Sequence, residues 1–280
     1  MTSEGVTPNP PAFEAAVRAH LAPHREQFNY DALVHTALDN ARFHRWAALV
    51  DRFRPLDGAS FLSSGCGMGG SLLAYHDAGA SRVTGVEVDA ATVEMARLRV
   101  AEIPSAEVHR VEPDPPLPFD DGAFDVIESM DVIEHVPDPR SYLADLVRVL
   151  APGGLILVVT PNRLWPVEQH LGIAGPPWLP VAAADRLFGR LAGARWLDDD
   201  RRFRYSRLAG MRTQNMSLRR LRALAVEADL HLRVLLREGG DHPLPPDHPR
   251  SERLLAHPIG KFVAPVRTLA VTLERRSSRG

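Results

Sequence analysis

Two groups of residues in this sequence have types and spacings that could do chemistry. The first is the glycine cluster Gly65-Cys66-Gly67-Met68-Gly69, with Glu87 following about twenty residues past the glycines. Glycines permit a tight turn and let the backbone approach a ligand closely, and a carboxylate at this spacing can accept both hydroxyls of a ribose. The pair predicts a site for an adenosyl ligand, and NAD, FAD and S-adenosylmethionine all fit it. The competing interpretations are a structural turn and a surface acid at a strand end.

The second group consists of Asp131, Glu134, His135 and the more distant His170. If the first three lie on one helical turn, their i, i+3, i+4 spacing places them on one face. With His170 from a later loop they offer two carboxylates and two imidazoles, a set that suits Mg²⁺, Mn²⁺ or Zn²⁺. Alternatively His135, His170 or Glu134 is a catalytic base that removes a proton from an alcohol. The competing interpretation is that the histidines hydrogen-bond to backbone and shape a pocket.

The elements that must position these residues follow an alternating order. Apolar runs predict seven strands, at 60–64, 82–87, 106–111, 124–129, 155–160, 230–236 and 267–273, with helices from about Gly70 and at 90–101, 139–150 and 217–228. Strands that alternate with helices of this length predict parallel βαβ units, and right-handed crossovers make a doubly wound, Rossmann-like α/β sheet. Ligands collect at the carboxyl ends of such strands. Both groups of residues lie there.

The domain organisation predicted from these patterns has four parts. Residues 1–55 form an N-terminal tail and two helices, 56–162 the cofactor-binding core, 163–215 an inserted helical lid that binds an acceptor, and 216–280 the C-terminal part of the core sheet. The motif Pro152-Gly153-Gly154 is expected to end the helix at 139–150. The lid is rich in Trp and Arg, which could hold a ring and an anionic group; ordinary packing and a solvated charged face are the alternatives.

Composition excludes several classes of protein. The chain has 280 residues and a net charge of −2, which argues against a broad electrostatic grip on nucleic acid or anionic lipid. Cys66 is the only cysteine, so an intrachain disulfide and a cysteine-built zinc site are excluded. The sequence shows no signal peptide and no apolar run near the ~20 residues of a membrane span. A cytoplasmic protein is therefore predicted, and the oligomeric state stays open.

Ordered motifs beyond the glycine cluster separate the candidate cofactors. The stretches Leu117-Pro118-Phe119, Glu134-His135-Val136-Pro137-Asp138 and Pro152-Gly153-Gly154 closely resemble the class I S-adenosylmethionine-dependent methyltransferases, and most of all the branch of ubiquinone-biosynthesis O-methyltransferases. The resemblance covers about residues 58–162. It implies that S-adenosylmethionine is the cofactor and that the cofactor-binding residues are Ser64, Gly65, Cys66, Gly67, Glu87, Val88, Asp114, Ser129 and Met130. Asp114 would meet the adenine amino group, with Glu112 as the alternative.

The same resemblance bears on the second group of residues. The pattern Asp-x-x-Glu-His with a distant His is similar to the metal-binding arrangement of methyltransferases that act on the terminal ribose of small RNAs, and of metal-dependent ubiquinone-pathway enzymes. Asp131 stands where glutamate is more usual, and Ser63 stands where the family usually has an acid. The favoured function is O-methylation of a small hydroxylated acceptor: a sugar, a phenol or catechol, or a specialised metabolite. Alternatives are C- or N-methylation of a natural product, a non-catalytic cofactor-binding module, and an RNA-modifying role.

Overall fold

The computed structural model describes residues 6–24, 30–113, 116–168, 170–211, 213–235 and 268–276. The chain divides into two compact units. Unit 1 contains Met1–Ser129 and Asp145–Leu157, and unit 2 contains Met130–Ala144 and Val158–Gly280. The candidate cofactor loop belongs to unit 1, whereas both candidate histidines belong to unit 2.

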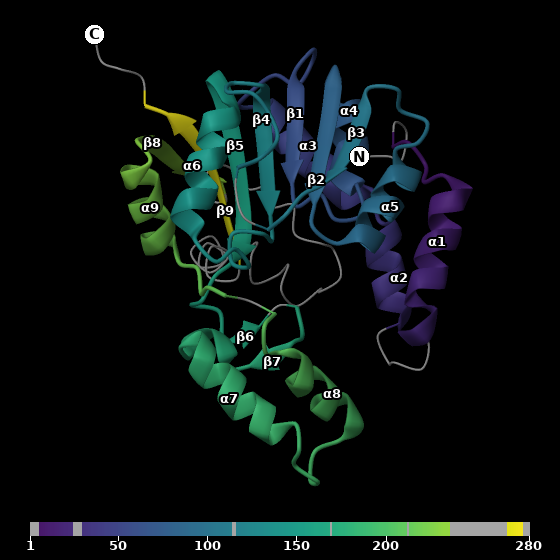
Figure 1. The fold of residues 1–280 in the computed structure, drawn as a ribbon, viewed down its shortest axis with the longest axis vertical. Helices are drawn as coiled ribbons and strands as arrows, with labels where there is room; N and C mark the ends of the chain where they lie inside the picture. The colour runs from purple at the N-terminus through teal and green to yellow at the C-terminus, as the bar shows by residue number, and fades with distance from the viewer. Residues whose placement is uncertain are drawn as a thin grey trace, which may run out of the picture. The chain divides into compact units, whose positions relative to one another are not determined.

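A seven-stranded mixed sheet has the order β3-β2-β1-β4-β5-β9-β8 (Figure 1). Its strands are β1 (Ser60–Ser64), β2 (Arg82–Glu87), β3 (Ala106–Arg110), β4 (Phe124–Met130), β5 (Leu150–Pro161), β8 (Leu230–Val234) and β9 (Thr268–Arg275). Strand β1 pairs in parallel with β2 and β4, while β8 pairs antiparallel with β9. The predicted doubly wound seven-stranded fold is therefore confirmed, and the alternating strand–helix order was enough to predict it.

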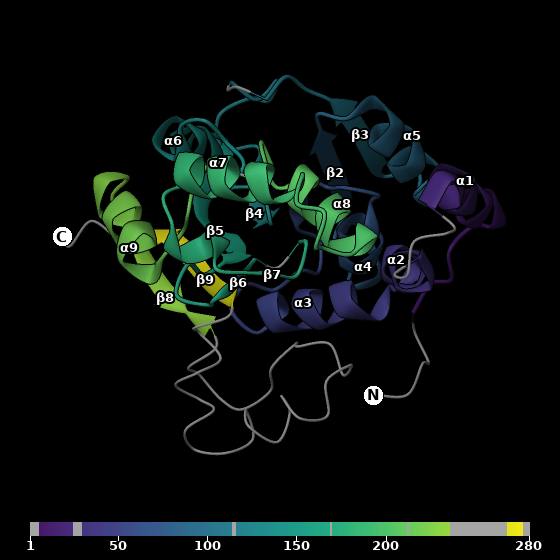
Figure 2. The same cartoon turned by 90° about the horizontal axis from the view of Figure 1, so that it is seen from below.

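The helices of unit 1 cover the glycine loop and its strands. Helix α4 (Gly70–Asp77) contacts β1 and β2, and α5 (Ala90–Arg99) contacts β2 and β3. Helix α1 (Pro11–Leu21) lies beside α5 and α2 (Tyr30–Leu38), as Figures 1 and 2 both show. Phe13 and Val17 of α1 pack with Met95 of α5 in one apolar cluster.

The prediction of two helices before β1 is wrong, because the described residues there already form three α-helices. The third is α3 (Ala41–Asp51), which begins directly after Asp39 and Asn40. The carboxylate of Asp39 accepts a hydrogen bond from the backbone N–H of Ala41, and the amide of Asn40 donates to the carbonyl of Thr7. Side chains that bind backbone groups in this way compete with helix continuation.

The strand after α6 (Pro139–Val149) begins earlier than expected. The predicted strand was 155–160, but β5 already starts at Leu150 and includes Pro152-Gly153-Gly154. A side chain at Gly154 would meet the carbonyl oxygen of Asp125 at 2.8 Å. This glycine therefore allows close backbone approach within the sheet, in addition to marking the end of a helix.

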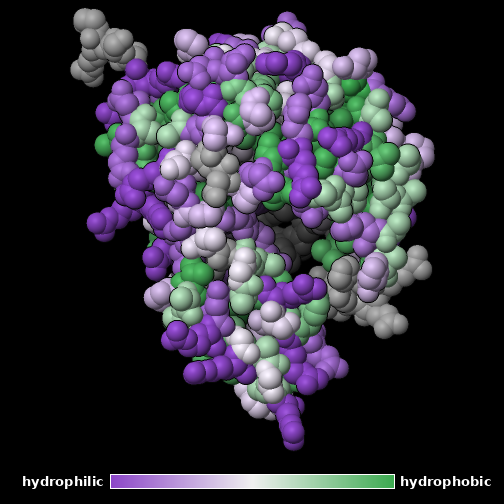
Figure 3. Space-filling model, in the orientation of Figure 1, coloured by the Kyte–Doolittle hydropathy of each residue, from purple (hydrophilic) through white to green (hydrophobic). Residues whose placement is uncertain are grey.

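Unit 2 contains the segment 163–215, which has more structure than the sequence suggested. Besides the expected helix α7 (Val181–Leu191), it contains α8 (Asp199–Arg207) and a hairpin of β6 (Val167–Glu168) with β7 (Ile173–Ala174). Ile173, Ala184, Phe188 and Leu208 form a core of their own. Trp196 is 75% exposed, and Figure 3 shows hydrophilic side chains mixed with apolar ones over this segment.

Arginines of α8 pair with acids of the same helix and its N-cap, and their binding of an anionic group stays a prediction. Arg202 pairs with Asp199, and Arg201 pairs with Asp198 within the same helical turns. Helix α9 (Leu218–Glu227) then leads into β8. None of the helices in the described ranges combines the length and the apolar composition that crossing a bilayer requires.

Candidate functional site

The glycine loop between β1 and α4 folds back over the end of β2. Gly65, Gly67 and Gly69 have φ angles of 77°, 50° and 80°, a region that disfavours side chains. The backbone N–H groups of Gly65 and Cys66 donate to the carbonyl of Val86 at 2.9 and 3.0 Å. The glycines are therefore used for backbone conformation, as the sequence indicated.

Glu87 ends β2 and reaches this loop. Its Oε2 accepts a hydrogen bond from the N–H of Gly67 at 3.1 Å, and its Oε1 accepts from the N–H of Val88 at 2.7 Å. The parallel pairing of β1 with β2, which aligns Ser64 with Val86, brings the carboxylate there. The structure thus joins the two features that predicted an adenosyl site, and the contact of Glu87 with ribose remains a prediction.

The remaining cofactor candidates lie at strand ends or outside the described residues. Ser64 and Ser129 are register partners on β1 and β4, and both are buried. Met130 is the last residue of β4, and the side chain of Val88 is exposed. Asp114 lies outside the described residues, so its predicted contact with adenine stays a prediction.

Cys66 is chemically quiet. Burial, followed by the charge of Glu87, raises the pKa of its thiol to about 12. A thiol with this pKa stays protonated at neutral pH and is a poor nucleophile. Cys66 is therefore a buried packing residue of the loop and is unsuited to covalent catalysis.

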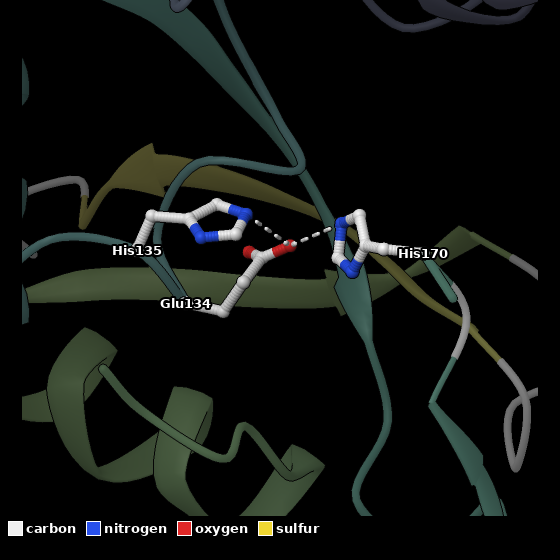
Figure 4. Close-up of side chains that lie close together, drawn as sticks. All are labelled: Glu134, His135 and His170. Atoms are coloured by element: carbon white, nitrogen blue, oxygen red, sulfur yellow. Dashed lines mark ion pairs between the residues drawn. The ribbon is translucent and has the colours of Figure 1, made fainter. Parts of the chain in front are cut away.

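Three of the four candidate metal ligands come together in unit 2. The Oε1 atom of Glu134 lies 3.8 Å from Nε2 of His135 and 4.0 Å from Nε2 of His170. Figure 4 shows this carboxylate oxygen between the two imidazole rings. One ligand atom from each residue lies within 4.8 Å of the others. We call Glu134, His135 and His170 the histidine–glutamate cluster.

Glu134 is held from several sides. Its Oε2 accepts a hydrogen bond from Oγ1 of Thr160 at 2.9 Å, and its backbone carbonyl accepts from the N–H groups of Thr213 and Gln214. The residue is only 3% exposed. Its Oε1 atom is buried and has no hydrogen-bond partner among the described residues, which is costly unless a donor or a cation meets it.

His170 is oriented by a second buried acid, Glu168. Oε1 of Glu168 lies 2.6 Å from Nδ1 of His170 and accepts from its backbone N–H, while Oε2 accepts from the N–H of Leu171. When Nδ1 carries the proton for this bond, the lone pair of Nε2 faces Glu134. The β6–β7 hairpin places Glu168 for this task.

Burial and neighbouring groups shift the pKa values of all three residues in the cluster. Burial, and then the charge of Asp131, raises the pKa of Glu134 to about 7. Burial, and then the charge of His170, lowers the pKa of His135. The hydrogen bond to Glu168 raises the pKa of His170. His135 is therefore the neutral imidazole at neutral pH, and His170 carries more positive charge.

Asp131 does not join this group. The expected helical turn is wrong: residues 131–138 form turns and bends, and Asp131 has a left-handed φ of 55°. Its backbone N–H donates to the carbonyl of Val159 on β5 at 2.8 Å. Asp131 is not among the three residues whose ligand atoms lie within 4.8 Å of one another, and it acts on Glu134 through its charge.

A pocket opens beside the cluster, within unit 2. It encloses about 340 Å³ of empty space, counting its open mouth. Glu134 and His170 line one part of it, and the rest of the lining mixes polar with apolar side chains, such as Asn162, Val167 and Met216. A group that enters this pocket lies next to Glu134 and His170.

Comparison with known proteins gives the family. Residues 38–233, more than half of the chain, match the family described as a methyltransferase domain. The chain belongs to the S-adenosylmethionine-dependent methyltransferases. This confirms the resemblance seen in the motifs and the cofactor that it implied; the comparisons do not establish a metal.

Individual relatives of the methyltransferase match it in part. It is 36% identical over 121 residues to a ubiquinone biosynthesis O-methyltransferase of Thiobacillus denitrificans, covering 42% of this chain and 50% of that protein. It is 37% identical over 129 residues to a Mycolicibacterium smegmatis protein named for S-adenosylmethionine-dependent methyl transfer, covering 46% and 48%. The chain thus spans about half the length of the curated relatives it matches.

The solved structures extend the likeness in fold. A methyltransferase structure from Mesorhizobium loti aligns with a TM-score of 0.54 at 17% identity. The alignment covers 83% of this chain and 98% of that one. At this identity the likeness supports the fold alone.

Sequence reasoning missed the residues that hold the cluster of this methyltransferase. Thr160 and Thr213 bind Glu134, and Glu168 binds His170. Glu168 left a readable signal, since an acid two residues before a candidate histidine can orient its ring. The two threonines left none, because their contacts join segments that are distant in sequence.

Proposed function

We propose that this methyltransferase transfers the methyl group of S-adenosylmethionine to an oxygen atom of a small hydroxylated acceptor, such as a sugar, a phenol, a catechol or a specialised metabolite. The observation that supports this most is the histidine–glutamate cluster, in which the buried Oε1 of Glu134 lies between two imidazoles, beside a pocket, with no hydrogen-bond partner among the described residues. An alcohol must lose its proton as it is methylated. The cluster offers groups for that step.

His135 is the candidate base in this proposal. Because burial lowers its pKa, its imidazole is neutral at neutral pH and can accept a proton. S-adenosylmethionine would supply the methyl group, with the acceptor oxygen taking the methyl carbon from sulfur, and His135 would take up the hydroxyl proton. The pairing with Glu168 raises the pKa of His170, so this imidazole is more often protonated already and is less available to accept the proton.

A divalent cation is the second part of the proposal, and the residues fit one. Glu134, His135 and His170 would hold it, because one carboxylate oxygen and two imidazole nitrogens lie within 4.8 Å of one another. Two nitrogen ligands favour Mn²⁺ or Zn²⁺ over Mg²⁺, which prefers oxygen. When bound, the cation would lower the pKa of an acceptor hydroxyl. The histidines would then be ligands, and Glu168 would orient one of them.

The test is turnover of isotopically labelled S-adenosylmethionine with catechols, phenols and sugars, in EDTA and with added Mn²⁺ or Mg²⁺. We expect an O-methylated product, lost in Glu134→Gln, while S-adenosylhomocysteine binding persists. The exposed acid Glu227 supplies the matched control Glu227→Gln. A product methylated on carbon or nitrogen would contradict the oxygen assignment. If EDTA leaves turnover unchanged, a role for the cation is excluded and His135 acts as the base without it.

A further inference from the structure

Another buried acid, Glu128, lies beneath the glycine loop and takes no part in the proposed acceptor chemistry. It is on β4, in register with Ser63 of β1, and both residues are almost fully buried, at 1% and 2% exposure. Oγ of Ser63 donates to Oε1 of Glu128 at 3.4 Å. Register partners on parallel strands point to the same face. That face carries α4, because Phe61, two residues before Ser63, stacks on Tyr75 of α4.

The carboxylate of Glu128 influences the loop itself. Its charge is among the causes that raise the pKa of the Cys66 thiol, after burial and the charge of Glu87. Ser71, in the first turn of α4, is a hydrogen-bond partner of Glu128. The acid therefore connects β4, β1 and the start of α4, where the positive end of the helix dipole favours a negative charge.

Burial makes the negative charge of Glu128 costly, although hydroxyl groups surround its carboxylate. The hydroxyls of Ser71 and Tyr75 on α4 act on the carboxylate and lower its pKa in part, but the buried Oε2 atom has no partner at hydrogen-bond distance within the described part of the chain. Burying a carboxylate with an unpartnered oxygen costs stability, and glutamine or threonine could also accept the hydrogen bond from Ser63. Groups that are costly to bury are concentrated at functional sites.

We propose that Glu128 belongs to the cofactor site, where its carboxylate positions the glycine loop and stabilises the positive charge of S-adenosylmethionine. The sulfonium of S-adenosylmethionine carries a charge that the thioether of S-adenosylhomocysteine lacks. A buried negative charge under the loop thus favours substrate cofactor over product cofactor. This inference uses the predicted binding of the cofactor at the glycine loop and is independent of the acceptor.

Calorimetric titration with S-adenosylmethionine and S-adenosylhomocysteine, at about pH 8 and without acceptor, tests the inference. We expect Glu128→Gln to weaken S-adenosylmethionine binding about tenfold, the size of one partly screened charge interaction. Binding of S-adenosylhomocysteine should change by about twofold or less. The double variant Ser63→Asp with Glu128→Ser moves the carboxylate to the neighbouring strand, about 5 Å away. It should restore S-adenosylmethionine affinity to within about threefold.

The matched control is Asp125→Asn on the same strand. Asp125 binds Ser60 and Arg54 near the start of β4, away from the loop, so its loss should lower the melting temperature and leave both affinities unchanged. Wild-type affinity in Glu128→Gln would overturn the inference. Equal loss of both ligands without rescue by the double variant would also overturn it. Failure of wild type to bind either ligand would overturn it together with the cofactor site, whereas a carbon-methylated product would leave it intact.

Discussion

Replacing Glu128 by glutamine should change how the free energy of unfolding depends on pH. Burial raises the pKa of this carboxyl from 4.5 to about 7, although the hydroxyls around it and the charge of Arg42 lower it in part. Between these two pH values the folded protein keeps a proton that the unfolded chain has released. The free energy of unfolding of the wild type therefore falls as pH rises through this window.

The size of the effect follows from the two pKa values. A pKa difference of one unit between the folded and unfolded states corresponds to about 1.4 kcal/mol. Ionisation of Glu128 therefore lowers the free energy of unfolding by about 3 kcal/mol above pH 7. Glutamine has a similar shape and does not ionise, so Glu128→Gln lacks this fall. Its amide can leave a buried N–H without a partner, which costs about 1–3 kcal/mol at every pH. The pH dependence of the difference is therefore more informative than its absolute value.

Urea unfolding of wild type and Glu128→Gln at about pH 5 and about pH 8 measures this difference. We expect the free energy of unfolding of the variant, relative to wild type, to rise by about 3 kcal/mol between the two conditions. Asp125→Asn is the control, because hydrogen bonds from Ser60 and the pairing with Arg54 outweigh burial and lower the pKa of Asp125. Its titration lies below this window. A difference that is the same at both pH values would refute the reasoning about Glu128.

Three further substitutions probe other parts of the molecule. Glu87→Ala removes the acceptor of a loop N–H and should weaken S-adenosylhomocysteine binding about 10–100-fold by calorimetry; near-wild-type affinity would speak against the ribose assignment. Gly85→Ala places a Cβ 2.7 Å from Sγ of Cys66, so the free energy of unfolding measured by thermal denaturation should fall by about 1–3 kcal/mol. An unchanged melting temperature would contradict this packing. Glu168→Gln releases His170 and should weaken Mn²⁺ binding about 10–100-fold by calorimetry; unaltered affinity would exclude His170 as a ligand oriented by this acid.

The sequence predicted the core sheet well because its signals are local. The bounds of β1 and β2 agree with the predicted runs 60–64 and 82–87, since each is an apolar segment bounded by turn residues. The glycine loop and Glu87 were also predictable. Once two strands pair in parallel, the residues at their carboxyl ends must meet at one edge of the sheet.

The errors occurred where hydrogen bonds between distant residues override local pattern. The metal-site prediction required Asp131 to lie on a helical turn, but the residue has a left-handed backbone conformation and its N–H donates to the carbonyl of Val159. The break at Asp39 and Asn40 likewise depends on partners outside the helix, including the carbonyl of Thr7. Helical periodicity carries no information about such bonds.

By itself, the sequence determined the fold class, the cofactor family and the residue types available for catalysis. Only the tertiary structure decided which of those residues meet: it joined Glu134 to His135 and His170, left Asp131 outside the cluster, and set Glu128 beneath the glycine loop. The physical reason is distance along the chain. Short-range propensity and apolar periodicity specify strands and helices, whereas contacts between side chains from different elements depend on register, loop conformation and packing, which act only after the elements assemble.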